Sequence, residues 1–378
     1  MNPLHPLIPS LSALAQHASV LPAHGGAMEQ LLQPDADERD DERLTGGEGV
    51  IDRFAEHPAP VSATAYIPCP PLVRIEHHRY RWFLDGSLRS YFLCTVLEGS
   101  RAVPVTLAQI GAARIHRRDD GKVTADAVPT RLLLLLDRSQ VSDAINRALD
   151  SASQAGGPEV VNTSPDDVFT HDAVESRDRA QGKAKVAMRR LELELAQGTP
   201  LQPTEWLVLD GTVYIASLLA LSGPLERTIG VSKSFAKSPR FRASRGRGEL
   251  HLTHLLATLP DAHRTPAFVS AQGKTAFWYV RLRPQGVVDY PLMGIVKVDV
   301  PLSSEQDSLP ADLITDLSRS LVGERTVTPY GRDVRWHAHL YPLYCAEQAI
   351  RGQFYSTMML KEGLTAYWRK AITSATPV

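Results

Sequence analysis

The feature that most constrains the fold of this chain is a series of short apolar segments between residues 80 and 136, rich in aromatic and β-branched residues and separated by turn signals. Such segments are typical of β-strands. Pro104 falls inside one of them and indicates an edge position or an irregularity, because proline has no amide hydrogen to donate. We expect three strands in a meander, followed by another strand or the start of a helix. The segments are Tyr80–Leu84, Arg89–Leu97, Ala102–Ile115 and Leu132–Leu136.

Residues 138–198 have the pattern of helices, with a break rich in Gly, Ser and Pro at 151–165. From Val168 to Ala196 the apolar residues recur at helical spacing. The segment Leu191–Leu195 also alternates with period two, as a strand would, but the residues before it favour a helix. Gly198 supplies a stop for this helix. The predicted apolar stripe consists of Ala184, Met188, Leu191 and Leu195.

In the remainder of the chain, predicted strands alternate with helical stretches. Trp206–Leu209 is a buried strand followed by Asp-Gly, and Leu343–Leu364 is a long amphipathic helix. Strands that meander first and then alternate with helices predict an α/β fold in which helices flank a mixed β-sheet. Further strands are expected at Arg227–Val231, Phe277–Leu282 and Ile295–Val300.

Composition narrows the class of protein. A chain of 378 residues, 43% hydrophobic and 22% charged, is long enough for one large domain or two modest ones. Its three cysteines are widely spaced without a Cys-x-x-Cys pattern, so we expect a reducing compartment and neither a disulfide framework nor a zinc site. No basic residue precedes Arg39, which argues against a signal peptide. The most apolar stretch, Trp206–Leu221, contains polar residues that exclude a membrane span. We expect a cytoplasmic protein.

Charge is distributed unevenly along the chain. The 41 basic and 42 acidic side chains give a net charge of −1, which excludes a globally basic nucleic-acid coat protein. Residues 1–60, however, carry ten acidic and three basic residues, and residues 223–297 carry four acidic and twelve basic ones. We interpret 1–60 as a poorly ordered or helical extension or partner-binding arm, the alternative being a solvated tail with no role. Residues 61–378 would form the main domain, with a helical insertion around 138–198.

Two of the predicted strands run into the same dipeptide, Asp85-Gly86 and Asp210-Gly211. A strand that ends in aspartate presents a carboxylate at the sheet edge, and the glycine allows the backbone to turn away. Two such strands side by side would bring together two hard oxygen ligands, which suit Mg²⁺ or Mn²⁺. The alternative is that each Asp-Gly is an ordinary turn.

A third carboxylate could come from the helix before Asp210. At 100° per residue, Glu192 lies slightly nearer the apolar stripe than Glu194 does, so Glu192 is the better inward candidate. The alternative is that both are solvated surface glutamates. Lys233 follows the predicted strand at 227–231 and could orient a water molecule or neutralise a phosphate.

Lys233 also opens a basic run with no acidic residue in it, which predicts a loop that follows a phosphate backbone. The alternative is a flexible, merely solvated loop. The run continues through Lys237, Arg240, Arg242, Arg245 and Arg247.

These residues together resemble NurA, the nuclease that partners the HerA translocase in DNA end processing. The resemblance covers about residues 75–365 and depends on the order and spacing of several short motifs. The motifs are Asp85-Gly-Ser, Glu192 ahead of Leu209-Asp210-Gly, Gly230-Val-Ser-Lys233, Trp278-Tyr-Val-Arg281, Val298-Asp-Val-Pro301 and Tyr341-Pro-Leu with Ala346.

The resemblance implies a ribonuclease H-like fold in which Asp85, Glu192 and Asp210 bind divalent metal. It also implies that Lys233 matches the active-site lysine of the family and that Tyr341 matches the tyrosine of the Tyr-Pro motif of the family. The family motif that usually reads Ala-His reads Ala346-Glu347 here. A glutamate can bind metal or accept a proton but cannot donate as an imidazolium does. Either His337 or His339 could substitute, or both could be ordinary surface or core histidines.

The function that the resemblance implies is metal-dependent hydrolysis of DNA, as a 5′–3′ exonuclease and single-strand endonuclease. One Mn²⁺ or Mg²⁺ ion would activate water and another would stabilise the leaving oxygen. Trp278 or Tyr279 could stack on a base, although core packing is expected for at least one of them. The implied partners are single-stranded DNA and duplex ends, a HerA-like hexameric ATPase and a second copy of the chain, in repair or anti-phage defence. No Walker A pattern occurs, so an ATPase activity would come from the partner.

Two alternatives stay open. The first is a catalytically inactive DNA-binding subunit of an ATPase complex, which the replaced histidine favours. The second is another ribonuclease H-like nuclease that acts on RNA. The sequence contains no recognisable module that reads base sequence, and this is compatible with the nuclease and with both alternatives.

Overall fold

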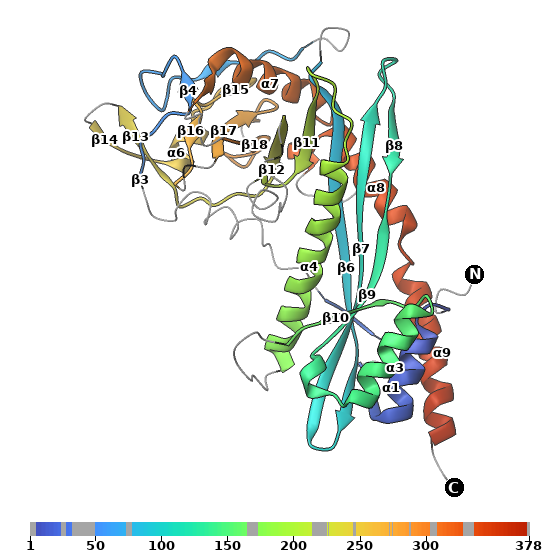
Figure 1. The fold of residues 1–378 in the computed structure, drawn as a ribbon. Helices are drawn as coiled ribbons and strands as arrows, with labels where there is room; N and C mark the ends of the chain where they lie inside the picture. Colours follow the sequence, from blue (N-terminus) through green and yellow to red (C-terminus); the bar gives the residue numbers. More distant parts are fainter. Residues whose placement is uncertain are drawn as a thin grey trace.

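The computed structural model describes most of the chain and shows an elongated molecule (Figure 1). Two long antiparallel strands, β6 (Tyr80–Glu98) and β7 (Arg101–Arg117), run through most of its length. The described residues are 5–23, 28–31, 50–72, 78–164, 173–213, 225, 227–244, 247–271, 273, 275–286, 289–302, 308–327 and 336–375.

The meander predicted between residues 80 and 136 is present, but with one correction. The segments Tyr80–Leu84 and Arg89–Leu97 are parts of the single strand β6, and Asp85-Gly86-Ser87 is not a turn. The reason is pairing, because Asp85, Gly86 and Ser87 lie opposite Ala113, Ala112 and Gly111 of β7. β9 (Thr130–Leu136) pairs with the other edge of β7, and β8 (Val123–Ala127) pairs with the end of β7.

Pro104 lies in β7 opposite Thr95 of β6, at a position that β9 does not reach. β9 pairs only with residues 106–111 of β7, so Pro104 is beyond the end of that neighbour. Its position is therefore an edge, as the sequence predicts, even though β7 is an interior strand elsewhere.

The break predicted at 151–165 contains a strand that the sequence analysis missed. α3 (Asp143–Gln154) is followed by β10 (Glu159–Asn162), which pairs in parallel with β9. The predicted helix then appears as α4 (Ala173–Gln197), and its expected start at 168–172 lies outside the described residues. α4 spans Leu191–Leu195, which confirms the predicted helix over the period-two alternative. Of the predicted stripe, Ala184, Met188 and Leu191 are buried, whereas Leu195 is only half-buried.

The second half of the large sheet begins with β11 (Trp206–Asp210), which is parallel to β6. β12 (Thr228–Ser232) is parallel to β11, and β18 (Ile295–Pro301) is antiparallel to β12. β17 (Thr275–Arg281) follows β18. The described strands of the sheet have the order β10-β9-β7-β6-β11-β12-β18-β17-β15-β5, with β15 at His263–Arg264 and β5 at Ile67–Pro68.

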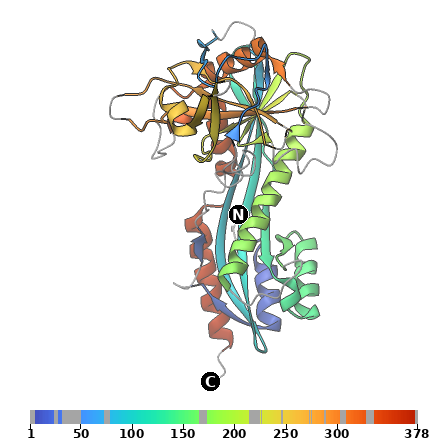
Figure 2. The ribbon, with the colours of Figure 1, turned by 90° about the vertical axis from the view of Figure 1, so that its left-hand side faces the viewer.

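Helices cover both faces of the long strands (Figure 2). α4 packs Leu193 against Leu84 and Leu209 on one face, whereas α8 (Tyr341–Gln353) packs Ile350 against Phe83 on the other. The single helix predicted at 343–364 is in fact two helices, α8 and α9 (Thr357–Ala375). The break occurs because Gln109 of β7 accepts a hydrogen bond from the Tyr355 amide at 2.8 Å and donates one to its carbonyl at 3.1 Å.

The first 60 residues are partly built into this structure. α1 (Ile8–His17) packs against α3, and β1 (Ser19–Pro22) and β2 (Glu29–Leu31) pair with β6. The acidic run 34–43 lies outside the described residues. In the described part of the chain, no helix is long and apolar enough to cross a membrane. The remaining elements are β3 (Val50–Ile51), β4 (Glu56–His57), η1 (Arg138–Gln140), β13 (Arg240–Ser244), β14 (Arg247–His251), α6 (Leu252–Ala257), β16 (Phe268–Val269), β19 (Leu309–Pro310), α7 (Ala311–Glu324) and η2 (Trp336–Ala338).

Candidate active site

The parallel pairing of β6 and β11 brings the two Asp-Gly dipeptides together. Leu84 of β6 is in register with Leu209 of β11, so Asp85 and Asp210 follow as neighbours on adjacent strands. β11 ends at Asp210, whereas β6 continues for another thirteen residues to Glu98. The expected juxtaposition of the two carboxylates is thus present, although only one of them stands at the end of its strand.

The two glycines serve different purposes. Gly211 has a φ of +95°, a left-handed conformation that turns the chain away after β11. Gly86 is extended, and what requires it is the close approach of Glu192. A Cβ atom at position 86 would lie 2.5 Å from Glu192 Oε1, so the carboxylate rests directly on the β6 backbone beside Asp85.

Glu192 and Glu194 have the orientations that the helical geometry predicts. Glu192 is 7% exposed, whereas Glu194 is exposed and pairs with Arg131 at 3.2 Å. Glu192 is therefore the inward carboxylate of α4, and it lies within the group that contains Asp85 and Asp210.

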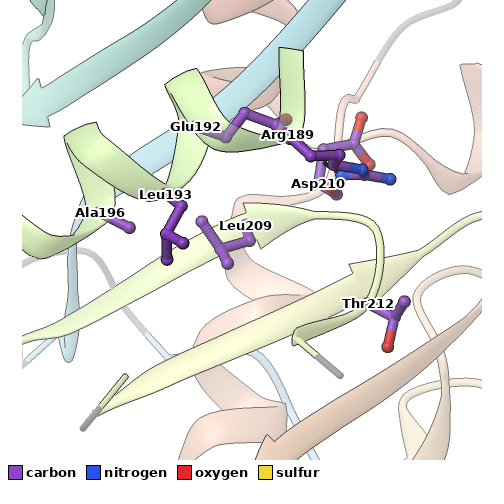
Figure 3. Close-up of a pocket in the computed structure, with 7 residues that line it drawn as sticks. All are labelled: Arg189, Glu192, Leu193, Ala196, Leu209, Asp210 and Thr212. Atoms are coloured by element: carbon purple, nitrogen blue, oxygen red, sulfur yellow. Dashed lines mark hydrogen bonds and ion pairs between the residues drawn. The ribbon is translucent and has the colours of Figure 1, made fainter. Parts of the chain in front are cut away.

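Two cations approach this group of carboxylates. Lys233 Nζ, just after β12, lies 2.5 Å from Asp210 Oδ2, and both side chains are largely buried. Arg189 of α4 donates to Glu192 Oε2 at 3.1 Å and to the Asp210 carbonyl at 3.4 Å. Figure 3 shows Arg189 and Asp210 turned toward each other beside a small pocket, which Glu192, Leu193, Ala196, Leu209 and Thr212 also line.

The pKa values of the two aspartates move in opposite directions. Burial, then the negative charge of Asp210, raise the pKa of Asp85 well above its usual range; Glu192 and Glu347 add to this, and Lys233 opposes it. Burial also acts to raise the pKa of Asp210, but the charge and hydrogen bond of Lys233, together with His339 and Arg189, hold that pKa below its usual value. The surroundings thus favour the protonated form of Asp85 and the ionised form of Asp210.

α8 and the segment before it supply further groups near the aspartates. Glu347 is close enough to raise the pKa of Asp85, and its own carboxylate pairs with Arg351 at 2.5 Å. His339 is buried and lies near enough to Asp210 to help hold its pKa down. His337 accepts a hydrogen bond from the Gly294 amide at 2.9 Å and is occupied there. Tyr341 begins α8 and is 46% exposed.

The donor set suits a hard divalent cation, since carboxylate oxygens are its preferred ligands. As the described residues stand, however, no group of three or more His, Cys, Asp and Glu side chains is arranged to hold a metal ion. Lys233 and Arg189 each pair with one oxygen of two of the three carboxylates, Asp210 Oδ2 and Glu192 Oε2. A metal ion at this place would compete with these two cations for the carboxylates.

Part of the basic run after Lys233 forms the β13–β14 hairpin and not a loop, which corrects the prediction for Arg240, Arg242 and Arg247. Arg240 in β13 pairs with Glu249 at 3.2 Å, and Arg242 pairs with Asp52 at 3.5 Å. Lys237 donates to the Phe235 carbonyl and lies 4.6 Å from the centre of that ring. Arg247 begins β14, and Arg245 lies outside the described residues. Figure 1 places this hairpin at the far end of the sheet region from β11.

The predicted base-stacking role of Trp278 or Tyr279 is wrong for this structure. Both side chains are fully buried in β17, and Trp278 Nε1 donates to Ser318 Oγ at 2.9 Å. The positive charge predicted for 223–297 is also partly internal, because four of the basic residues whose side chains the structure describes there are less than 10% exposed. These are Arg264, Arg281, Arg283 and Lys297.

Two residues of the site, Arg189 and Asp299, were missed from the sequence. Arg189 precedes Glu192 by three positions, a spacing that could have identified it as the helical partner of that glutamate. Asp299 was quoted only as part of a motif, yet its carboxylate accepts hydrogen bonds from the segment after Asp210. Of the two histidines that the sequence offered as substitutes for the family histidine, His339 lies near Asp210, and this proximity depends on tertiary structure. A scan against models of known protein families finds none that matches the chain, and a search among curated proteins finds no match either.

Proposed function

We propose that this chain is a divalent-metal-dependent phosphodiesterase that cuts DNA. The observation that carries the proposal is the register of β6 and β11, which sets Asp85 beside Asp210. Glu192 packs against the β6 backbone at Gly86, the residue that follows Asp85. Buried carboxylates collected at one point are costly unless a cation or proton compensates them, and such clusters are typical of functional sites. An ordinary pair of turns would not need Glu192 to be buried there.

The residues of the site have separable roles in this proposal. Asp85, Glu192 and Asp210 would hold Mn²⁺ or Mg²⁺, which when bound supplies an activated water and charge stabilisation at the leaving oxygen. Asp85 would act as a ligand in its ionised form. Lys233, once released from Asp210, is placed to neutralise a phosphate oxygen, and Arg189 can do the same from α4.

The family and the partners are part of the same proposal. The mixed sheet with helices on both faces, in which β6, β7 and β9 are antiparallel and β6, β11 and β12 are parallel, supports a ribonuclease H-like fold. On the resemblance to NurA, the activity would be 5′–3′ exonuclease and single-strand endonuclease, carried out by a homodimer with a HerA-like ATPase. Tyr341 and Glu347, on α8, would face the substrate side of the carboxylates.

The test is incubation of the protein with end-labelled single- and double-stranded DNA and RNA, in Mn²⁺, Mg²⁺ or EDTA. We expect metal-dependent loss of DNA label, and at least a thousandfold slower cutting by the Asp210→Ala variant, because removal of a ligand removes the metal-assisted step. Asp316→Ala is the matched control, since Asp316 is a half-exposed aspartate paired with Arg79 at 3.0 Å. If Asp210→Ala cuts as fast as Asp316→Ala, the site assignment is wrong. Preferential loss of RNA label would instead favour a ribonuclease.

A second candidate function has a specific observation in its favour. Asp210 is paired with Lys233, and Glu192 is paired with Arg189, so the charges of these two carboxylates are balanced within the protein. A subunit that binds DNA without cutting it could have such a site. This candidate predicts DNA binding by the wild-type protein with no loss of label under any metal. It also predicts that Asp210→Ala leaves DNA affinity unchanged.

A further inference from the structure

We propose that Asp299 is a positioning residue that holds Asp210 in place by fixing the chain immediately after β11. The proposal rests on the proposed function for its activity readout, but its structural part can be measured independently. Asp299 lies on β18 and is 1% exposed. Its role would be to keep the carboxylate of Asp210 at a constant place relative to Asp85 and Lys233.

In the described part of the chain, the carboxylate of Asp299 accepts hydrogen bonds from the segment that turns away from the site. Asp299 Oδ2 accepts a hydrogen bond from Thr212 Oγ1 at 2.6 Å. The Val213 amide approaches both carboxylate oxygens, at 3.1 and 3.3 Å. A carboxylate that accepts from a backbone amide and from a hydroxyl fixes both residues more firmly than a neutral acceptor would.

These contacts cross a whole strand. β18 and β11 are not neighbours in the sheet, because β12 lies between them. Asp299 is in register with Gly230 of β12, and its carboxylate passes over that glycine to reach the far side. A Cβ atom at position 230 would lie 2.2 Å from Asp299 Oδ1, 2.5 Å from the Gly211 carbonyl oxygen and 2.6 Å from the Val213 nitrogen.

The absence of a side chain at Gly230 is therefore what allows the carboxylate and the turn to meet. The Gly211 amide in turn donates to the Val231 carbonyl at 2.9 Å, so the turn is held from the adjacent strand as well. Together these bonds leave the residues after Asp210 little freedom. Outer-shell groups of this kind typically change metal affinity or activity by about 10- to 100-fold when they are removed.

The experiment compares Asp299→Asn with Ser318→Ala. Asparagine keeps the shape of the side chain but removes its negative charge and replaces one acceptor oxygen with a donor, so the hydrogen bonds from Thr212 and Val213 lose their charge assistance. Ser318→Ala removes another buried hydrogen bond, that of Trp278, and serves as the control for general loss of stability. Thr212→Val, which removes only the hydroxyl donor, is a second variant in case Asp299→Asn does not fold.

Two readouts are expected to separate positioning from a merely structural role. Hydrogen exchange at the Val213 amide, measured without metal or DNA, should become at least tenfold faster in Asp299→Asn and stay unchanged in Ser318→Ala. With labelled DNA, kcat of Asp299→Asn should fall about 10- to 100-fold while KM is retained. Thr212→Val should change both quantities in the same direction and by less.

Unchanged exchange at Val213, or a fall in kcat no greater than that of Ser318→Ala, would overturn the proposal. Failure of the proposed function has a different signature. In that case the wild-type protein itself cuts no nucleic acid, and hydrogen exchange at Val213 still decides whether Asp299 fixes the turn.

Discussion

The Asp85-Gly86 and Asp210-Gly211 dipeptides are identical in sequence but differ in structure. The first lies inside β6, a strand of 19 residues. β6 pairs with β7 both before and after this dipeptide. The second ends β11, a strand of five residues, and turns at a left-handed glycine. The difference shows that neighbouring strands determine whether an Asp-Gly dipeptide turns the chain, and that glycine can be required for close approach alone.

The electrostatic surroundings of the two aspartates differ as well. Asp210 has an ammonium group at 2.5 Å, whereas the groups that act on Asp85 are chiefly other carboxylates. The pKa of Asp210 is lowered and that of Asp85 is raised. Ionised Asp210 should therefore stabilise the folded protein, and ionised Asp85 should destabilise it.

The largest effect on stability is expected from Lys233→Met. Removal of the ammonium leaves a largely buried carboxylate without its closest cation, which should lower the free energy of unfolding at pH 7 by about 3 kcal/mol. Because Lys233 lowers the pKa of Asp210 in the folded state, this stabilisation is present above the unfolded pKa of about 4 and is lost as the pH falls below it. Urea unfolding at pH 7 and at pH 3 measures both parts.

The double variant Lys233→Met/Asp210→Asn is the control for this comparison. It removes both charges together, so it should recover most of the lost stability. If the double variant is no more stable than Lys233→Met alone, the loss comes from packing of the lysine stem, and the electrostatic contrast between Asp210 and Asp85 is weaker than we infer.

The next effect concerns the two glycines. Gly211→Ala forces an alanine to a φ of +95° and should cost about 1–3 kcal/mol of folding free energy. Gly86→Ala should cost less, because the atom its Cβ meets is Oε1 of the Glu192 side chain, which can rotate away. Thermal unfolding of the two variants tests the order. A larger loss for Gly86→Ala than for Gly211→Ala would show that Glu192 is held rigidly.

Much of the strand content could be predicted from the sequence because local patterns determine it. The apolar runs that became β7, β9, β11, β17 and β18 are continuous and bounded by turn residues. The prediction failed where long-range pairing decides. Pairing with β7 straightens Asp85-Gly86, and hydrogen bonds from Gln109 break the last helix at Tyr355.

The candidate site, like the fold, was predictable where local patterns determine it and not where long-range contacts do. The carboxylates were found because strand ends and helical spacing are local properties, and Glu192 was correctly preferred to Glu194. Burial of Trp278 and Tyr279 could not be found in this way, because strand alternation does not show that both faces of β17 are covered. Net charge was misleading for a related reason, since a count of basic residues does not show that Arg264 pairs with Glu56 inside the protein.

The smallest predicted effect is a gain in stability from Asp85→Asn. A carboxyl with a raised pKa in the folded state favours unfolding as the pH rises from its unfolded value of about 4 toward its folded value, because the unfolded chain releases the proton first. Asparagine cannot ionise, so at pH 7 in EDTA the variant should unfold about 1–3 °C higher than the parent. At pH 3, where Asp85 is protonated in both states, the gain should vanish.

Asp126→Asn is the control, because that carboxylate already has Arg114 at 2.6 Å and its removal should bring no gain. Equal or lower stability of Asp85→Asn at pH 7 would mean that Asp85 is ionised in the folded protein, and the contrast with Asp210 would no longer hold.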